Sequence, residues 1–211
     1  MGLNLSGWEC PEPGVLFVVT GSSGSGKTTL VKDALNVIPD TGFSVSATTR
    51  PARPGERDGE DYHFVTPEDF ESRVASAGFL EWAEVYGNRY GTLRAPVESA
   101  VSSGQSIVLD IDVQGAEQVR NAWTGCVSIF VLPPSLDALA ARLRARGTDS
   151  NEVVERRIAE AHVQISRCDE FDYLLVNDDL AAAKDQFQAI LVAEMLKRSR
   201  RQQWVRRFTS R

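Results

Sequence analysis

The residues Gly21-Ser22-Ser23-Gly24-Ser25-Gly26-Lys27-Thr28 follow the pattern G-x-x-x-x-G-K-[ST], in which a glycine-rich loop wraps around nucleotide phosphates. A short apolar run over residues 15–19 precedes the loop, as expected for a buried parallel strand. Residues 28–37 follow it with apolar side chains at helical spacing. A strand, a glycine-rich loop and a helix are the context that this motif requires. The sequence therefore predicts a P-loop rather than a glycine–serine linker that matches by chance.

The chemistry of such a loop comes mainly from its backbone. Glycines permit unusual backbone angles, so successive N–H groups can turn inward around a phosphate at the positive end of the following helix. We expect Lys27 to reach the β and γ phosphates and the Thr28 hydroxyl to bind Mg²⁺.

Size and composition favour one domain with inserted lobes, since the chain has 211 residues and is 42% hydrophobic. It contains no run of about 18 apolar residues, so no transmembrane span is expected. Residues 1–13 lack the basic and apolar blocks of a signal peptide. Three widely spaced cysteines, Cys10, Cys126 and Cys168, indicate reduced thiols and a cytoplasmic protein.

Charge is distributed unevenly along the chain. Residues 195–211 hold seven of the 23 Lys and Arg and no acid, which leaves 16 basic against 29 acidic residues elsewhere. A basic tail can contact nucleic acid or an acidic partner. We favour the plainer interpretation, the charged end of the last helix followed by a frayed terminus, and expect no nucleic-acid partner.

Strands and helices alternate after the P-loop, which predicts an α/β fold around a parallel sheet. Further strands are expected near residues 107–109, 127–131 and 174–176. Helices are expected over 114–122, over 135–146 with Ser135 as N-cap and Gly147 as stop, from 150 toward 167, and over roughly 180–200.

The interval 43–95 breaks this alternation and reads as an inserted mixed α+β lobe that carries the substrate. It is rich in Pro and Gly and contains short β-like pieces. One helix fits inside it, with Thr66 as N-cap, Pro67 as its first residue, Asp69 at the third position and Gly78 past the end.

The insertion also holds side chains that suit a phosphorylated acceptor. Arg50 and Arg53 are three residues apart in a proline-stiffened stretch, and guanidinium groups bind phosphate oxygens in a bidentate manner. Further donors lie in Asp61-Tyr62-His63-Phe64 and Asn88-Arg89-Tyr90-Gly91-Thr92. The carboxylates of Glu81 and Asp112 can accept hydrogen bonds from guanine N1–H and its amino group, whereas adenine presents an acceptor at N1.

Several separated motifs resemble the guanylate kinase family, from about Gly14 to Ile190. Besides the P-loop and the two stretches just quoted, they are Phe43-Ser44-Val45-Ser46-Ala47-Thr48-Thr49-Arg50, Phe79-Leu80-Glu81-Trp82-Ala83, Leu109-Asp110-Ile111-Asp112-Val113-Gln114-Gly115 and Val176-Asn177-Asp178-Asp179-Leu180. The resemblance implies a core at 14–42, 96–132 and 170–195, a GMP-binding insertion at 43–95 and a helical lid at 133–169. Residues 1–13 and 196–211 lie outside it as an extension and a basic tail.

The resemblance also implies roles for individual residues. It places the GMP phosphate on Arg50, Arg53, Tyr62 and Tyr90, and guanine near Ser46, Glu81, Thr92 and Asp112. It implies that ATP is bound by Gly21, Ser22, Ser23, Gly24, Ser25, Gly26, Lys27, Thr28, Thr29, Arg146 and Asn177. Asp110 matches a Walker-B position that acts on Mg²⁺ through water. Lys27, Arg50 and the lid arginines Arg142, Arg146 and Arg157 would meet the transferring phosphoryl group.

The implied reaction is phosphorylation of GMP, and of dGMP, by ATP in purine nucleotide metabolism. Plainer interpretations exist for these residues: surface charges for the arginines, core aromatics for the tyrosines and a solvent-facing strand position for Glu81. Rival functions are a P-loop kinase with another phosphorylated acceptor and a non-catalytic guanylate-kinase-like binding module. A regulatory GTP switch is disfavoured because the motif Asn-Lys-x-Asp is absent. The sequence sets no oligomeric state.

Overall fold

A computed structural model describes residues 5, 8, 11–85, 87–145 and 150–210. The described chain is organised around a parallel five-stranded sheet with the order β2-β7-β1-β8-β9. Its strands are β1 (Leu16–Thr20), β2 (Thr41–Phe43), β7 (Ser106–Asp110), β8 (Val127–Leu132) and β9 (Tyr173–Val176). The predicted α/β class with a parallel sheet is therefore confirmed.

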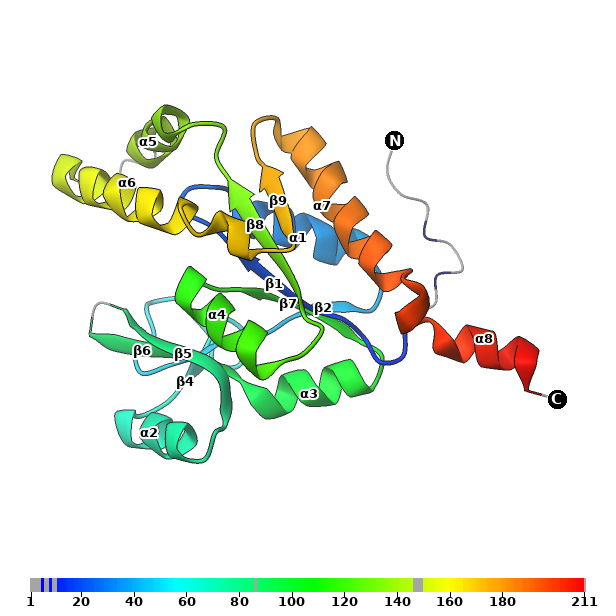
Figure 1. The fold of residues 1–211 in the computed structure, drawn as a ribbon. Helices are drawn as coiled ribbons and strands as arrows, with labels where there is room; N and C mark the ends of the chain where they lie inside the picture. Colours follow the sequence, from blue (N-terminus) through cyan, green and yellow to red (C-terminus); the bar gives the residue numbers. More distant parts are fainter. Residues whose placement is uncertain (1–4, 6–7, 9–10, 86, 146–149, 211) are drawn as a thin grey trace.

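Helices cover both faces of this sheet, which explains why β1 reads as an unbroken apolar run. Alternate residues of β1 face opposite sides. Phe17 and Val19 pack with helices α1 (Lys27–Val37) and α7 (Leu180–Met195), whereas Leu16 and Val18 pack with α3 (Arg94–Ser102) and α4 (Val113–Ala122). Figure 1 shows the two layers of helices on either side of the sheet.

A second, four-stranded sheet has the order β4-β3-β6-β5 and mixes parallel and antiparallel pairs. Its strands are β3 (Ala47–Thr48), β4 (His63–Phe64), β5 (Phe79–Val85) and β6 (Asn88–Leu93). Helix α2 (Pro67–Ala75) packs on it, with buried Phe70 stacked against Phe79 at 4.4 Å between ring centroids. As predicted, Thr66 caps α2 by accepting a hydrogen bond from the Asp69 N–H at 3.1 Å.

Helices α5 (Leu136–Ala145) and α6 (Asn151–Ile165) form a pair with a small core of their own, in which Leu139 and Leu143 meet Val154 and Ala161. Ser135 accepts from the Ala138 N–H, and Ser150 caps α6. The predicted end of the first helix at Arg146 and Gly147 lies outside the described residues. The pair and the second sheet lie on the same side of the molecule, above and below the end of the main sheet (Figure 1).

The prediction of one last helix over 180–200 is wrong. Helix α7 ends at Met195, a 3₁₀ turn follows at Arg198–Arg200, and a separate helix α8 covers Gln202–Thr209. The chain turns because Glu194 is buried and attracts cations back onto itself. Lys197 Nζ lies 2.6 Å from one carboxylate oxygen of Glu194 and Arg200 Nη2 lies 3.8 Å from the other. The basic tail is thus folded as far as residue 209 rather than frayed.

Within the described ranges, no helix combines the length and apolar character needed to cross a bilayer.

Candidate active site

The P-loop connects the end of β1 to the start of α1, in the predicted order. Helix α1 has no side-chain cap at its N-terminus and no acidic residue in its first turn. Its first N–H groups and its dipole are therefore available to an anion. The loop bends through Gly26, whose φ of +95° is a conformation that side chains with a Cβ rarely adopt.

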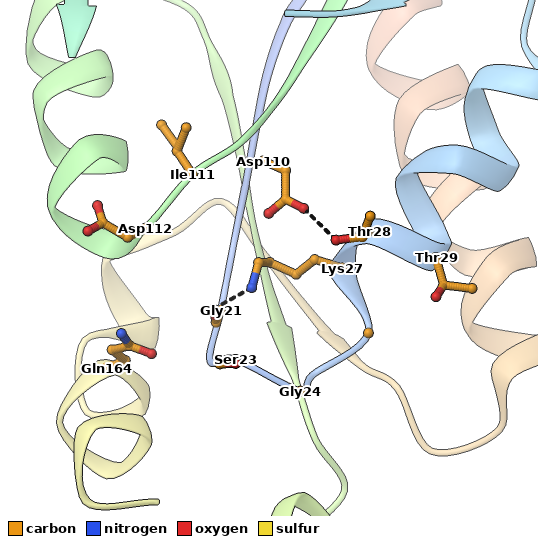
Figure 2. Close-up of a pocket in the computed structure, with 11 residues that line it drawn as sticks. Gly21, Ser23, Gly24, Lys27, Thr28, Thr29, Asp110, Ile111, Asp112 and Gln164 are labelled. Atoms are coloured by element: carbon orange, nitrogen blue, oxygen red, sulfur yellow. Dashed lines mark hydrogen bonds between the residues drawn. The ribbon is translucent and has the colours of Figure 1, made fainter. Parts of the chain in front are cut away.

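Lys27 and Thr28, for which phosphate and Mg²⁺ binding were predicted, both lie at the start of α1. Lys27 Nζ donates to the carbonyl of Gly21 at 2.7 Å and to that of Ser22 at 3.3 Å, so its ammonium group lies over the loop. The Thr28 hydroxyl donates to Asp110 Oδ2 at 3.0 Å (Figure 2). Burial raises the pKa of Asp110, and Lys27 and Thr28 oppose that shift. The cation and the hydroxyl thus offset only part of the cost of burying a carboxylate at the end of β7.

A second segment supports the loop from outside. Asn177, which follows β9, is buried and donates from Nδ2 to the Ser25 carbonyl at 2.7 Å. A Cβ at Gly26 would lie 2.2 Å from the same amide nitrogen, so Asn177 also explains why residue 26 is glycine. Arg142 Nη2 donates to the Asn177 carbonyl at 2.8 Å, which ties α5 to this contact.

The loop opens into a cavity of about 400 Å³. Its lining residues come from the P-loop, the end of β7, the start of α4 and α6: Gly21, Ser23, Gly24, Gly26, Lys27, Thr28, Thr29, Asp110, Ile111, Asp112 and Gln164. The remaining loop serines, Ser22 and Ser25, have buried hydroxyls without a hydrogen-bond partner in the described structure. Unpaired donors inside a loop of this kind suit a ligand rich in acceptor oxygens.

In the inserted lobe, Arg50 is half-buried rather than a free surface charge. Its Nη2 donates to Glu56 Oε1 at 2.8 Å, and its Nη1 donates to the Pro51 carbonyl at 2.7 Å. The guanidinium carbon lies 5.4 Å from the centroid of the Tyr62 ring. The bond from Arg50 lowers the pKa of Glu56. The guanidinium thus already holds one anionic partner.

The other predicted phosphate ligands lie near this guanidinium or on the same turn. The Tyr62 and Tyr90 rings meet edge to face at 5.9 Å. The backbone N–H of Arg53 donates to Glu56 at 2.7 Å, while its side chain is exposed.

Ser46, predicted to lie near guanine, is half-buried at the start of the lobe, where its carbonyl accepts from the His63 N–H at 2.9 Å.

Glu81 is buried, which excludes the interpretation of a solvent-facing strand residue. Its Oε1 accepts from the Thr92 hydroxyl at 2.6 Å, across the antiparallel pair of β5 and β6. Burial raises the pKa of Glu81 to about 7, Thr92 opposes the shift, and the nearby charge of Asp112 adds to it. Glu81 is buried and Asp112 is exposed, and together the two carboxylates suit a ligand that presents two or more N–H donors.

Asp110 and Asp112 belong to different elements. Strand β7 ends at Asp110, and Asp112 is the N-cap of α4, where its Oδ1 accepts from the Gly115 N–H at 2.7 Å. The side chain of Asp112 has the short polar form that caps helices, which explains why α4 begins directly after it. Both residues still line the cavity.

Of the remaining lid arginines, the structure describes Arg157 but not Arg146. Arg157 is half-buried on α6. Two further residues were not predicted to take part: Gln164, which lines the cavity from α6, and Glu56, the partner of Arg50. Neither has a sequence signal, because only the folded chain brings it to the site.

Comparison with known proteins identifies the family of this chain. The sequence model of guanylate kinase matches residues 14–194. The chain belongs to the guanylate kinase family. The family match ends within α7, so α8 lies beyond it.

Alignments with individual relatives cover most of both chains. The guanylate kinase of Symbiobacterium thermophilum is 52% identical over 181 residues, which are 86% of each chain. That of Sphingopyxis alaskensis is 51% identical over 188 residues, 89% of this chain and 86% of the relative. The crystal structure of guanylate kinase from Anaplasma phagocytophilum matches with a TM-score of 0.73 and 36% identity, covering 91% of this chain and 92% of that one.

Proposed function

We propose that this chain transfers the γ-phosphoryl group of ATP to GMP, giving ADP and GDP, and that it also accepts dGMP. The observation that carries the proposal is the single cavity shared by the P-loop and Asp112. It joins a site for nucleotide phosphates to one of the two carboxylates that suit guanine. Membership in the guanylate kinase family and relatives bearing that name support the same reaction.

On the donor side, residues 21–29 would bind the ATP phosphates through backbone N–H groups, the Ser22 and Ser25 hydroxyls and Lys27. Asn177 would lie near adenine, and Arg146 would contact ATP from the lid.

The residues present also fit Mg²⁺. The Thr28 hydroxyl and the Asp110 carboxylate meet at the cavity, and hard cations prefer oxygen ligands. We propose Thr28 as a direct ligand and Asp110 as a ligand through water. When bound, Mg²⁺ would supply positive charge to the β and γ phosphates.

On the acceptor side, Arg50, Arg53, Tyr62 and Tyr90 would bind the GMP phosphate. A phosphate group would compete with Glu56 for Arg50. Ser46, Glu81, Thr92 and Asp112 would face guanine, where ionised carboxylates accept from N1–H and the 2-amino group. Adenine at the same place would leave a buried carboxylate unpaired, which is the basis of strong rejection.

The transfer itself would rely on positioning and charge. An acceptor phosphate oxygen forms the new bond to the γ phosphorus, and the bond to the bridging oxygen breaks, so that ADP leaves with that oxygen. The acceptor phosphate is already ionised, hence no strong general base is required. Lys27, Arg142, Arg146 and Arg157 would neutralise the transferring group, and closure of the lid and the inserted lobe would exclude water.

The domain limits given above, with the insertion at 43–95 and the lid at 133–169, are part of this proposal. The cysteines of the chain are widely spaced, which favours a reducing compartment. We therefore place the enzyme in the cytoplasm. The rival binding-module function is disfavoured by the intact constellation of Lys27, Thr28 and Asp110.

A stoichiometric assay tests the proposal. Purified protein, Mg-ATP and GMP should give ADP and GDP in equal amounts, and omission of GMP should abolish ADP formation. ADP without GDP would indicate an ATPase, and neither product from folded protein would favour the binding module.

A further inference from the structure

We propose that one face of helix α4, formed by Gly115 and Gln118, positions Glu81 and thereby sets selectivity for guanine. This inference rests on the proposed function and deepens it. Neither residue would touch the nucleotide. Both would act by holding a carboxylate of the inserted lobe against the core of the kinase.

Gly115 leaves the space that Glu81 occupies. A Cβ at residue 115 would lie 2.7 Å from Glu81 Oε2 and 3.3 Å from Asp112 Oδ1. The first distance is shorter than real Cβ contacts allow, so the Glu81 carboxylate would have to move. The same glycine donates its N–H to Asp112 at 2.7 Å. Gly115 therefore lies beside both of the carboxylates that are proposed to face guanine.

Gln118 holds the strand that carries Glu81. Its Oε1 accepts from the Trp82 N–H at 3.0 Å, and its Nε2 donates to the Trp82 carbonyl at 2.9 Å. Among the residues that the structure describes, β5 is the edge strand of its sheet, so the Trp82 N–H and carbonyl that face away from β6 meet no neighbouring strand there. The side-chain amide of Gln118 takes the place of that strand.

The other neighbour of Glu81 is fixed from the same helix. Leu80 is buried in the cluster that contains Val113, Ala116 and Val119 of α4. Residues 80 and 82 are thus both anchored to α4, one by apolar packing and one by hydrogen bonds. Glu81 belongs to the lobe and Asp112 to the core, yet the distance between their carboxylates is governed by this one junction.

The variant Gly115→Ala separates selectivity from folding. The obstructing atom is the far end of a flexible side chain, so the chain should fold, and replacing a helical glycine with alanine favours the helix. We expect an unchanged or higher Tm, together with a kcat/KM for GMP that falls on the order of tenfold or more because the displaced carboxylate loses its bonds to guanine. With inosine monophosphate, which lacks the 2-amino group, the fall should be smaller.

The variant Gln118→Ala tests the second support. It should lower the ratio of kcat/KM for GMP to that for inosine monophosphate, mainly through KM for GMP. Gln118→Glu keeps the acceptor for the Trp82 N–H but loses the donor, so it should fall between wild type and Gln118→Ala. Gln186→Ala, an exposed glutamine of α7, is the matched control and should behave as wild type.

The outcomes separate this inference from the proposed function. Wild-type protein that fails to phosphorylate GMP would overturn the proposed function and this inference with it. Wild-type turnover of GMP, combined with a wild-type ratio of GMP to inosine monophosphate in Gly115→Ala and Gln118→Ala, would overturn the inference alone. Equal losses for both acceptors would also contradict it, because they would show a general structural role. GMP affinity measured by calorimetry on the ATP-free protein provides a readout without turnover.

Discussion

At the scale of single residues, the state of Glu81 links the pH to the affinity for GMP. Burial raises its pKa from the usual 4.5 to about 7, so the free protein carries a neutral carboxyl below that pH. Only the ionised form can accept from both N1–H and the 2-amino group of guanine. We expect the Kd for GMP to decrease by up to about tenfold per pH unit as the pH rises toward 7, and to level off above it. Calorimetry between about pH 5.5 and 8.5 would measure this, because that range covers both the slope below the pKa and the plateau above it.

The variant Glu81→Gln is the control for this titration. It should bind GMP weakly, and the Glu81 contribution to the pH dependence should vanish. The raised pKa of Glu81 also makes the stability of the free protein depend on pH, in the direction opposite to GMP affinity. The folded chain binds more protons than the unfolded chain between pH 4.5 and 7, so the free energy of unfolding falls as the pH rises through that window. At pH 8, Glu81→Gln should therefore stabilise the free protein by on the order of 2 kcal/mol. An unchanged pH profile would contradict the assignment.

Residue chemistry explains what the sequence could predict at this scale. Arg50, Tyr62, Glu81 and Asp112 were predicted because the types of side chain fit a phosphate and a guanine. Their partners were not: Glu56 carries no signal of its own, and Gly115 was part of a family motif without a role being assigned to it. A hydrogen bond across six residues, or a glycine that leaves room for a carboxylate, becomes visible only when the backbone is folded.

At the scale of elements, Asn177 joins the end of β9 to the P-loop. The variant Asn177→Ala removes the donor of the Ser25 carbonyl and leaves that group buried without its partner, at a cost of about 1–3 kcal/mol. We expect KM for ATP to rise roughly tenfold while KM for GMP changes little. The measurement is steady-state kinetics with each substrate varied in turn, together with a thermal unfolding curve.

Asn36→Ala, an exposed asparagine of α1, is the matched control for that variant and should leave both constants unchanged. Equal effects of Asn177→Ala on ATP and GMP would show that the contact supports the whole fold rather than the donor loop.

The elements themselves were largely predictable from the sequence. Apolar runs gave the strands, and Thr66, Ser135 and Ser150 marked the starts of helices. The end of α7 was not predictable, since residues 180–200 contain no glycine or proline to stop a helix. The stop depends on the buried charge of Glu194, which draws Lys197 and Arg200 back toward the body.

At the scale of the whole molecule, the C-terminal tail should serve stability rather than catalysis. Helix α8 lies at the side of the molecule opposite the inserted lobe and the α5–α6 pair (Figure 1). A chain truncated after residue 195 would lose both cations that face buried Glu194, whereas one truncated after residue 201 would keep them. We expect the first to lose about 3 kcal/mol of unfolding free energy and the second clearly less, with kcat and KM unchanged in both.

Chemical denaturation of the two truncated chains would measure this difference. Adding Glu194→Gln to the shorter chain should restore much of the loss, because it removes the unpaired charge while Tyr173 can still donate to residue 194. Equal stabilities of the two truncated chains would contradict the role given to Glu194.

The overall architecture was predictable because alternating strands and helices allow few arrangements. The position of the inserted lobe was not, since it depends on packing between β5 and α4, two elements about 30 residues apart in the chain. That packing brings Glu81 of the lobe to Asp112 of the core and completes the proposed acceptor site.

The most direct test of the account is the choice of acceptor. ADP formation from Mg-ATP would be measured with GMP, dGMP, AMP, CMP and UMP offered separately to the wild-type protein. The account predicts rapid turnover confined to GMP and dGMP. Turnover with AMP or a pyrimidine nucleotide at a comparable rate would contradict the roles of Glu81 and Asp112, and turnover with none would contradict the proposed reaction.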